Sequence, residues 1–211
     1  MQLILSFLAA SVLLTLAPGP DILFVATKSM ARGARSGISV AAGLCTGVFL
    51  HTSLAAFGAS LILRESPLAF DALKIAGTLY LLWLALQAVR HRNDVPGGGA
   101  AASTRPDGGS AEPFFRLYRT GVLMNALNPK VALFFLALLP QFVPAGAEHP
   151  QLHMLLLGGI FAAQGFVVFS VVSFCAGFVF SSLSKKRGFA KALNLLTAAV
   201  LVLVAAALFF V

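Results

Sequence analysis

The chain has 211 residues, of which 59% are hydrophobic and 10% are charged, with a formal net charge of +8 at pH 7. A soluble domain carries about 25% charged residues, so this composition excludes a soluble globular protein and indicates a polytopic membrane protein. The positive charge does not indicate a nucleic-acid partner, because the basic residues lie in short connections between apolar stretches. That distribution is typical of membrane orientation.

Six stretches are apolar and long enough to cross the hydrocarbon core, which takes about 20 residues. They are the predicted spans 3–30, 38–63, 68–89, 120–142, 152–183 and 190–211. The segment Met1–Ala17 lacks the basic start of a signal peptide, so we interpret it as the first half of a span. Cys45 and Cys175 fall inside spans without disulfide or zinc spacing, which favours core residues over a redox pair.

Two of the six predicted spans are interrupted. The first contains Leu16-Ala17-Pro18-Gly19-Pro20-Asp21, and the fourth contains Asn125-Ala126-Leu127-Asn128-Pro129-Lys130. Proline removes a backbone donor and clashes with the preceding turn, so helices 1 and 4 should break or kink here. A membrane tolerates a broken helix only where protein or a water-filled cavity satisfies the freed backbone groups. We therefore predict that Asp21 and Lys130 face one shared polar site.

The basic residues also predict the orientation of the chain. Twelve of the fifteen Lys and Arg residues lie in the first, third and fifth connections, as Lys28, Arg32, Arg35, Arg90, Arg92, Arg105, Arg116, Arg119, Lys185, Lys186, Arg187 and Lys191. Because cytoplasmic loops carry the excess of basic residues, these connections should face the cytoplasm. Both termini should then lie outside the cytoplasm.

Residues 91–113 are rich in glycine and proline and predict a flexible cytoplasmic linker. The linker divides the chain into a first half, 1–90, and a second half, 114–211, with three spans each. An odd number of spans gives the halves opposite orientations, so the pattern indicates an inverted repeat. The predicted fold is therefore all-α, with six transmembrane helices in two inverted three-helix halves.

Each charge lies at the start of a half-helix, where the helix dipole stabilises the acid Asp21 and disfavours the cation Lys130. Asp21 follows Pro20, and an acid is stabilised at a helix N-terminus. Lys130 sits where the helix dipole disfavours a cation, and burying it in a membrane costs about 2.5–3.5 kcal/mol. Two hypotheses stay open at this point. Asp21 and Lys130 form a buried ion pair that clamps the halves, or they bind the ammonium and carboxylate groups of a zwitterionic substrate.

Other residues near the breaks extend the predicted binding site. The interruptions at Gly19 and Pro20 and at Asn125 and Asn128 expose backbone N–H and carbonyl groups that could bind a zwitterion. Asn128 could equally be the cap of the second half-helix. His51 lies near the middle of the second span, where it could relay protons or make one interhelical hydrogen bond.

The remaining motifs favour packing over chemistry. Gly43 and Gly47 form a small-xxx-small pair that lets helices approach closely, and a homodimer is left open. No nucleophile–base motif, metal spacing or Walker A loop is visible in the sequence, so we expect neither an enzyme nor a metal or cofactor. Uphill transport would then draw on an ion gradient, with Asp21 or His51 as the proton carrier.

Several of these motifs together resemble one family. Ala17-Pro18-Gly19-Pro20-Asp21 and the stretch from Ser29 to Gly37 resemble the opening of the LysE/RhtB family of bacterial amino-acid exporters. The same pattern continues through Gly43 to Gly47, His51, Gly58, Leu73 to Leu82, Phe115 to Gly121, Asn125, Asn128-Pro129-Lys130 and Pro140-Gln141-Phe142. The resemblance covers nearly the whole chain, although the linker is longer and richer in glycine than the family pattern.

The resemblance implies a secondary transporter in the bacterial inner membrane that exports amino acids from the cytoplasm. The likeness is nearer to the homoserine/threonine branch, which implies small neutral amino acids or their derivatives as substrates. A channel or ion exporter and a membrane scaffold without transport activity are the alternatives.

Overall fold

The computed structural model describes residues 2–59, 66–93, 112–144, 146–176 and 188–210, and every regular element within these ranges is helical. In chain order the elements are α1 (Gln2–Leu16), α2 (Pro20–Arg32), α3 (Ala34–Ser53), η1 (Leu54–Ala59), α5 (Pro67–Arg90), α7 (Phe114–Ala126), α8 (Pro129–Leu133), η2 (Phe134–Leu138), η3 (Leu139–Phe142), α9 (Pro150–Cys175) and α11 (Phe189–Phe210).

Four of these stretches are single helices long and apolar enough to cross a membrane: α3 with η1, α5, α9 and α11. Two further candidates are bent pairs. The helices α1 and α2 meet at 57°, and α7 meets the segment from α8 through η3 at 52°. By length and composition, the described residues thus hold four helices that could cross a membrane, or up to six spans if each bent pair is one. This confirms the predicted all-α polytopic fold and both predicted breaks.

The start of the fourth predicted span was wrong. Helix α7 begins at Phe114, directly after Pro113, whereas the hydropathy pattern predicted a start at position 120. The reason is that Arg116 and Arg119 lower the hydropathy of the first turns without interrupting the helix. The ends of the second and fifth predicted spans, 60–63 and 177–183, and linker residues 94–111 lie outside the described residues.

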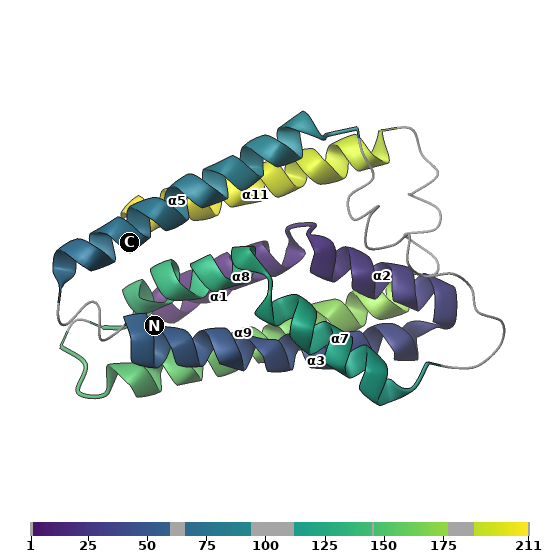
Figure 1. The fold of residues 1–211 in the computed structure, drawn as a ribbon, viewed down its shortest axis with the longest axis horizontal. Coiled ribbons are helices and arrows are strands. Elements are labelled where there is room, and N and C mark those ends of the chain that lie inside the picture. Colours follow the sequence, from purple (N-terminus) through teal and green to yellow (C-terminus); the bar gives the residue numbers. More distant parts are fainter. Residues whose placement is uncertain (1, 60–65, 94–111, 145, 177–187, 211) are drawn as a thin grey trace.

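The helices form two layers. Figure 1 shows α5 and α11 side by side in one layer, with the other helices gathered in the second. Within the second layer, α3 packs against both α7 and α9. The helix that follows the broken span is α3 in the first half and α9 in the second, and these two helices contact each other. The last helices of the two halves, α5 and α11, also contact each other. This pairing of corresponding helices is what two related three-span halves would produce.

Glycines set the closest helix contact, between α3 and α7. A Cβ placed on Gly43 would lie 2.0 Å from the carbonyl oxygen of Tyr118, and one placed on Gly121 would lie 2.3 Å from that of Val40. Only a residue without a side chain allows this approach. The predicted small-xxx-small pair, Gly43 and Gly47, therefore packs within the chain.

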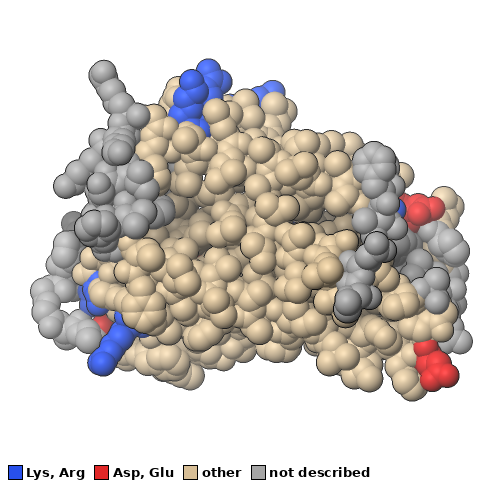
Figure 2. Space-filling view, turned by 180° about the vertical axis from the view of Figure 1, so that it is seen from behind, with Lys and Arg blue, Asp and Glu red and all other residues tan. Residues whose placement is uncertain are grey.

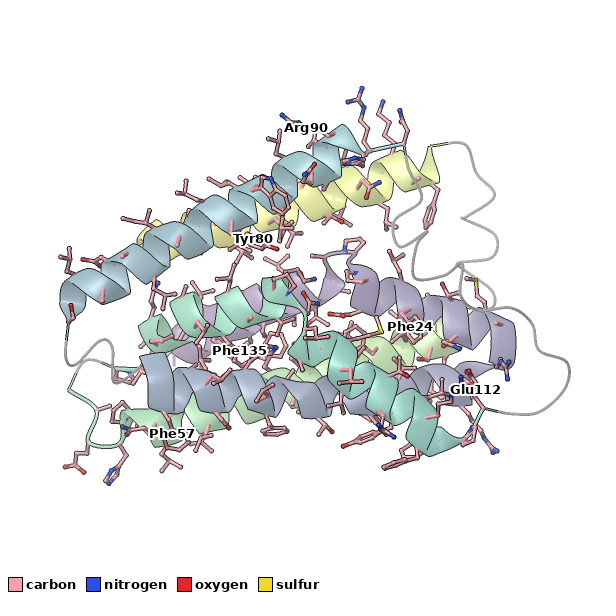
Figure 3. All side chains as sticks on the ribbon, viewed as in Figure 1. Phe24, Phe57, Tyr80, Arg90, Glu112 and Phe135 are labelled. Carbon is pink, nitrogen blue, oxygen red and sulfur yellow. The ribbon has the colours of Figure 1, made fainter. Side chains whose placement is uncertain are left out.

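The core beneath one end of the bundle is aromatic. It consists of five buried phenylalanines whose rings contact one another, namely Phe7, Phe134, Phe135, Phe142 and Phe161. Figure 3 shows Phe135 turned into the bundle, whereas Phe57, which is 63% exposed, points outward. Figure 2 shows a broad surface without charge, with most visible basic residues toward one end and most acidic residues toward the other.

Candidate functional site

The first break leaves several carbonyl groups without their helical partners, among them those of Leu14 and Ala17. Helix α1 ends at Leu16, and Pro18 has no N–H to donate to the carbonyl of Leu14 four residues earlier. The carbonyl of Ala17 has no helical donor either, because α2 begins only at Pro20. These oxygens lie at the C-terminal, negative end of the α1 dipole. They therefore need a donor from elsewhere, preferably a cation.

Lys130 supplies that donor from the other break. Its Nζ donates hydrogen bonds of 3.2 Å to the carbonyl of Leu14 and of 3.2 Å to the carbonyl of Ala17. The lysine side chain is buried, with 8% exposure for the residue. An ammonium group has three donors, so one N–H remains beyond these two bonds. The positive N-terminal end of α8 disfavours the ammonium group of Lys130, and the negative C-terminal end of α1 offsets this cost.

Asn128 connects the second break to Asp21. Its Oδ1 accepts a 3.0 Å hydrogen bond from the backbone N–H of Lys130, which confirms the predicted cap. Its Nδ2 donates a 2.5 Å hydrogen bond to Oδ2 of Asp21, which begins α2 and is also buried. Each charged residue therefore binds the opposite break. Asp21 and Lys130 do not form a direct ion pair, so the first of the two hypotheses, a buried pair between them that clamps the halves, was wrong.

A small cavity of about 20 Å³ lies at this crossing. That volume suits about one water molecule, which needs at least about 10–15 Å³, and is far too small for an amino acid. Asp21, Asn125 and Lys130 line the cavity. Its apolar wall comes mainly from α1, α3 and α9, through Leu14, Leu44, Cys45, Val48, Phe161, Gly165 and Phe169. The structure therefore shows a closed state of the crossing.

Two acceptor atoms at the cavity have no hydrogen-bond partner in the described part of the chain. They are Oδ1 of Asp21 and Oδ1 of Asn125, and both are buried. An unpaired buried acceptor costs about 1–3 kcal/mol. Together with the spare donor of Lys130, these atoms form a polar set that could bind a molecule carrying both donors and acceptors.

The other predicted site residues shape the crossing without lining the cavity. Gly19 has an extended backbone, and a Cβ there would lie 3.2 Å from Nζ of Lys130. Pro20 is the first residue of α2. His51 lies behind Asn125, and its Nε2–H donates a 2.9 Å hydrogen bond to that residue's carbonyl, while its Nδ1 has no partner among the described residues. The interhelical hydrogen bond expected of His51 is confirmed, and its role as a relay stays a prediction.

Two further hydrogen bonds hold the first break from neighbouring helices, and sequence reasoning missed only that of Thr197. Thr197 of α11 donates a 2.9 Å hydrogen bond to the carbonyl of Pro18, and Gln164 of α9 donates one of 2.9 Å to Thr15. Nothing in the sequence distinguishes Thr197 from other threonines. Gln164 is conspicuous as an amide inside an apolar span, which predicts a bond between helices.

A second polar contact lies at the basic end of the bundle. Nζ of Lys28, in α2, is 2.7 Å from Oε2 of Glu112, just before α7. The hydrogen bond from Lys28 holds the pKa of the Glu112 carboxyl below its usual value, with further attraction from Arg32 and Arg116. The ring of Phe24 lies 5.5 Å from the same Nζ. This ion pair ties the two broken spans together on the side opposite the aromatic core, and the sequence showed only a basic loop and a linker here.

Comparison with known proteins identifies the family. Residues 12–210 match the family model described as LysE type translocator. The chain is 34% identical over 155 residues to a homoserine/homoserine lactone efflux protein of Salmonella typhimurium, covering 74% of this chain and 70% of the relative. It is 27% identical over 189 residues to a leucine efflux protein of Salmonella choleraesuis, covering 90% and 86%. No solved structure matches. The chain belongs to the LysE family, a family of translocators and not of enzymes.

Proposed function

We propose that the protein is a secondary transporter that exports small neutral amino acids or their derivatives, similar to threonine or homoserine, from the cytoplasm. The observation that carries this proposal is the crossing of two broken spans, which buries a carboxylate and an ammonium group at one cavity. Intramembrane charges at helix breaks are typical of transport sites near the middle of a bilayer. The two relatives are named a homoserine/homoserine lactone efflux protein and a leucine efflux protein, so both names give export of an amino acid or its derivative.

The polar atoms of the cavity suit the two ends of an amino acid. The free Oδ1 of Asp21 can accept from the substrate's ammonium group, with Oδ1 of Asn125 as a second acceptor. The spare N–H of Lys130 can donate to the carboxylate. Asn128, Gly19 and Pro20 hold these groups in place from the two breaks. A zwitterion brings one charge of each sign, so its binding adds no net charge to the buried site.

The halves must rearrange for a substrate to enter. A cavity of about 20 Å³ has to widen severalfold to hold an amino acid. We propose that the Lys28–Glu112 pair closes the basic end and that this end faces the cytoplasm, because cytoplasmic loops carry the excess of basic residues. The aromatic core closes the other. We propose that the halves 1–90 and 114–211 form an inverted repeat and rock about the crossing, exposing it to each side in turn.

The apolar wall of the cavity favours a second substrate class. On the apolar side of the cavity, Phe161, Phe169 and Val48 offer contacts to a branched aliphatic side chain and no hydrogen-bond partner for a hydroxyl group on that side. A site that leaves a hydroxyl unpaired gains little from it. Leucine and similar amino acids are therefore the second candidate, and export of either class would be driven by the proton motive force through Asp21 or His51.

Efflux from loaded membrane vesicles tests the proposal. Vesicles or cells would be loaded with labelled threonine, homoserine, leucine or lysine, and the loss of label followed with and without a proton gradient. We expect the wild type to accelerate the loss of at least one neutral amino acid. Asp21→Asn and Lys130→Ala should abolish this acceleration while still inserting in the membrane.

Two matched variants serve as controls. Asp71→Asn and Lys74→Ala change the same charges in α5, away from the cavity, and should transport at the wild-type rate. Unchanged efflux in both Asp21→Asn and Lys130→Ala would exclude the crossing as the binding site. Wild-type vesicles that release every substrate no faster than empty membranes would favour a channel, an ion exporter or a scaffold.

A further inference from the structure

The end of α1 holds two carbonyl acceptors that the transport proposal above does not use. We infer that the carbonyl oxygens of Leu14 and Ala17, together with the free Oδ1 of Asp21, form a binding subsite for a primary ammonium group. Lys130 fills this subsite in the closed state, and the α-ammonium of the substrate fills it in the loaded state. The second half of this inference rests on the proposed function, while the subsite itself does not.

The composition of the subsite selects a cation that carries N–H donors. Both carbonyls are left free by the Pro-Gly-Pro break and point from the negative end of a helix. The neighbouring carbonyl of Pro18 is already bound by Thr197. The two carbonyls accept two of the three donors of a primary ammonium group, and the third donor is left for a neighbouring acceptor such as Oδ1 of Asp21.

Lys130 occupies the subsite in a way that allows it to leave. Its ammonium touches backbone carbonyls and has no direct carboxylate partner among the described residues. The four-carbon side chain is flexible, and Gly19 leaves the space that its Nζ uses. Oδ1 of Asp21 lines the same cavity, buried and unpartnered. The arrangement is therefore an ammonium site filled by a tethered ligand, with one acceptor still open.

The exchange of ligands keeps the charge balance. When a substrate carboxylate binds Lys130, the lysine is drawn away from Leu14 and Ala17, and the substrate's own ammonium can take those acceptors. The carbonyls of Leu14 and Ala17 then hold one ammonium group in both states, and neither carbonyl is left without a donor. Removing Lys130 should expose the subsite to small ammonium ions from solution.

Thermal unfolding of purified Lys130→Ala tests this directly. We expect its melting temperature to lie below that of the wild type and to rise, saturably and by about 2–4 °C, on addition of ethylammonium chloride. Tetramethylammonium chloride has the same charge without N–H donors, and sodium chloride gives the same ionic strength, so neither should raise the melting temperature. Wild type and Lys74→Ala should not respond to any of the three salts.

Three results would overturn the subsite. The melting temperature of Lys130→Ala could rise equally with tetramethylammonium or sodium, or it could fail to rise with ethylammonium. The melting temperature of Lys74→Ala could also rise as much as that of Lys130→Ala. If Lys130→Ala does not accumulate in the membrane, Lys130→Met is tested in the same way, because a methionine side chain has a similar length and no N–H donor for the carbonyls. The assay needs no transport, so it can succeed or fail independently of the efflux experiment.

A second measurement uses the wild type alone. An amino acid that protects the protein from thermal unfolding is compared with its N,N,N-trimethyl derivative, which keeps the positive charge but has no N–H donor. Because bonds to the carbonyls need those donors, we expect half-maximal protection to require at least about tenfold more of the derivative. Equal protection by both would show that the carbonyls do not bind the ammonium group.

Discussion

Asn128 is the residue on which both halves of the crossing depend. Its Oδ1 accepts from the backbone of Lys130 and its Nδ2 donates to Asp21. An amide is suited to this position because it offers an acceptor and a donor on one planar group. A residue that keeps only one of these functions should separate the structural role of Asn128 from its role at the carboxylate.

We therefore predict different effects for two substitutions of Asn128. Asn128→Ala loses the cap and the bond to Asp21, and it should lower the free energy of unfolding by about 1–2 kcal/mol. Asn128→Asp can still cap the helix, but it turns a second carboxylate toward that of Asp21. We therefore expect it to lose most of its efflux while its free energy of unfolding stays nearer to the wild-type value than that of Asn128→Ala. Thermal unfolding and vesicle efflux measure the two effects. Wild-type efflux by Asn128→Asp would contradict the assignment.

At the scale of elements, proline and glycine decide how the helices lie. Pro18 and Pro129 stand at the two bends of 57° and 52°, so both breaks could be predicted from the sequence. The contact of α3 with α7 depends on Gly43 and Gly121, whose backbones approach within van der Waals distance. The spacing of Gly43 and Gly47 predicted such a contact, but it could not say which helix would be the partner.

The contact makes a specific prediction for Gly43→Ala. A methyl group there would lie 2.0 Å from the backbone of Tyr118, so the helices must separate, and overpacking of this kind costs about 1–3 kcal/mol. Gly159→Ala is the control, because it adds the same methyl group to α9 with no atom within 4 Å. The melting temperature should be lower than that of the wild type for Gly43→Ala and should not fall for Gly159→Ala. Equal melting temperatures would contradict the packing.

At the scale of the whole molecule, the Lys28–Glu112 pair joins the two broken spans at the basic end. The pKa of Glu112 is lowered in the folded protein from its ordinary value of 4.5. The ionised carboxylate therefore adds to the free energy of unfolding at pH values above 4.5. The contribution is lost as the pH falls from that value through the lower folded pKa. Glu112→Gln should remove this part of the acid sensitivity. The free energy of unfolding, followed from pH 7 downward, should fall less steeply below pH 4.5 in the variant, and parallel curves would contradict the prediction.

The orientation of the molecule gives a further prediction. Glu148 is exposed between η3 and α9, and Arg92 is exposed just after α5, at opposite ends of the proposed spans. With Cys45 and Cys175 replaced by serine, a membrane-impermeant thiol reagent added to intact cells should label Glu148→Cys and spare Arg92→Cys. Inside-out vesicles should give the reverse pattern. Labelling of Arg92→Cys from outside the cells would invert the proposed topology.

The sequence by itself determined the apolar spans, the two breaks and the identity of the buried polar residues. Hydropathy, proline chemistry and the cost of a charge in lipid are local properties, so Asp21, Lys130 and Asn128 could be identified without a structure. The partners of those residues were decided only by the tertiary structure. Lys130 binds Leu14 and Ala17 and not Asp21, because the distance between two breaks more than a hundred residues apart depends on how α3, α7 and α9 pack. The residues of the apolar cavity wall could likewise not be predicted from the sequence, because a phenylalanine that faces the cavity has the same hydropathy as one that faces lipid.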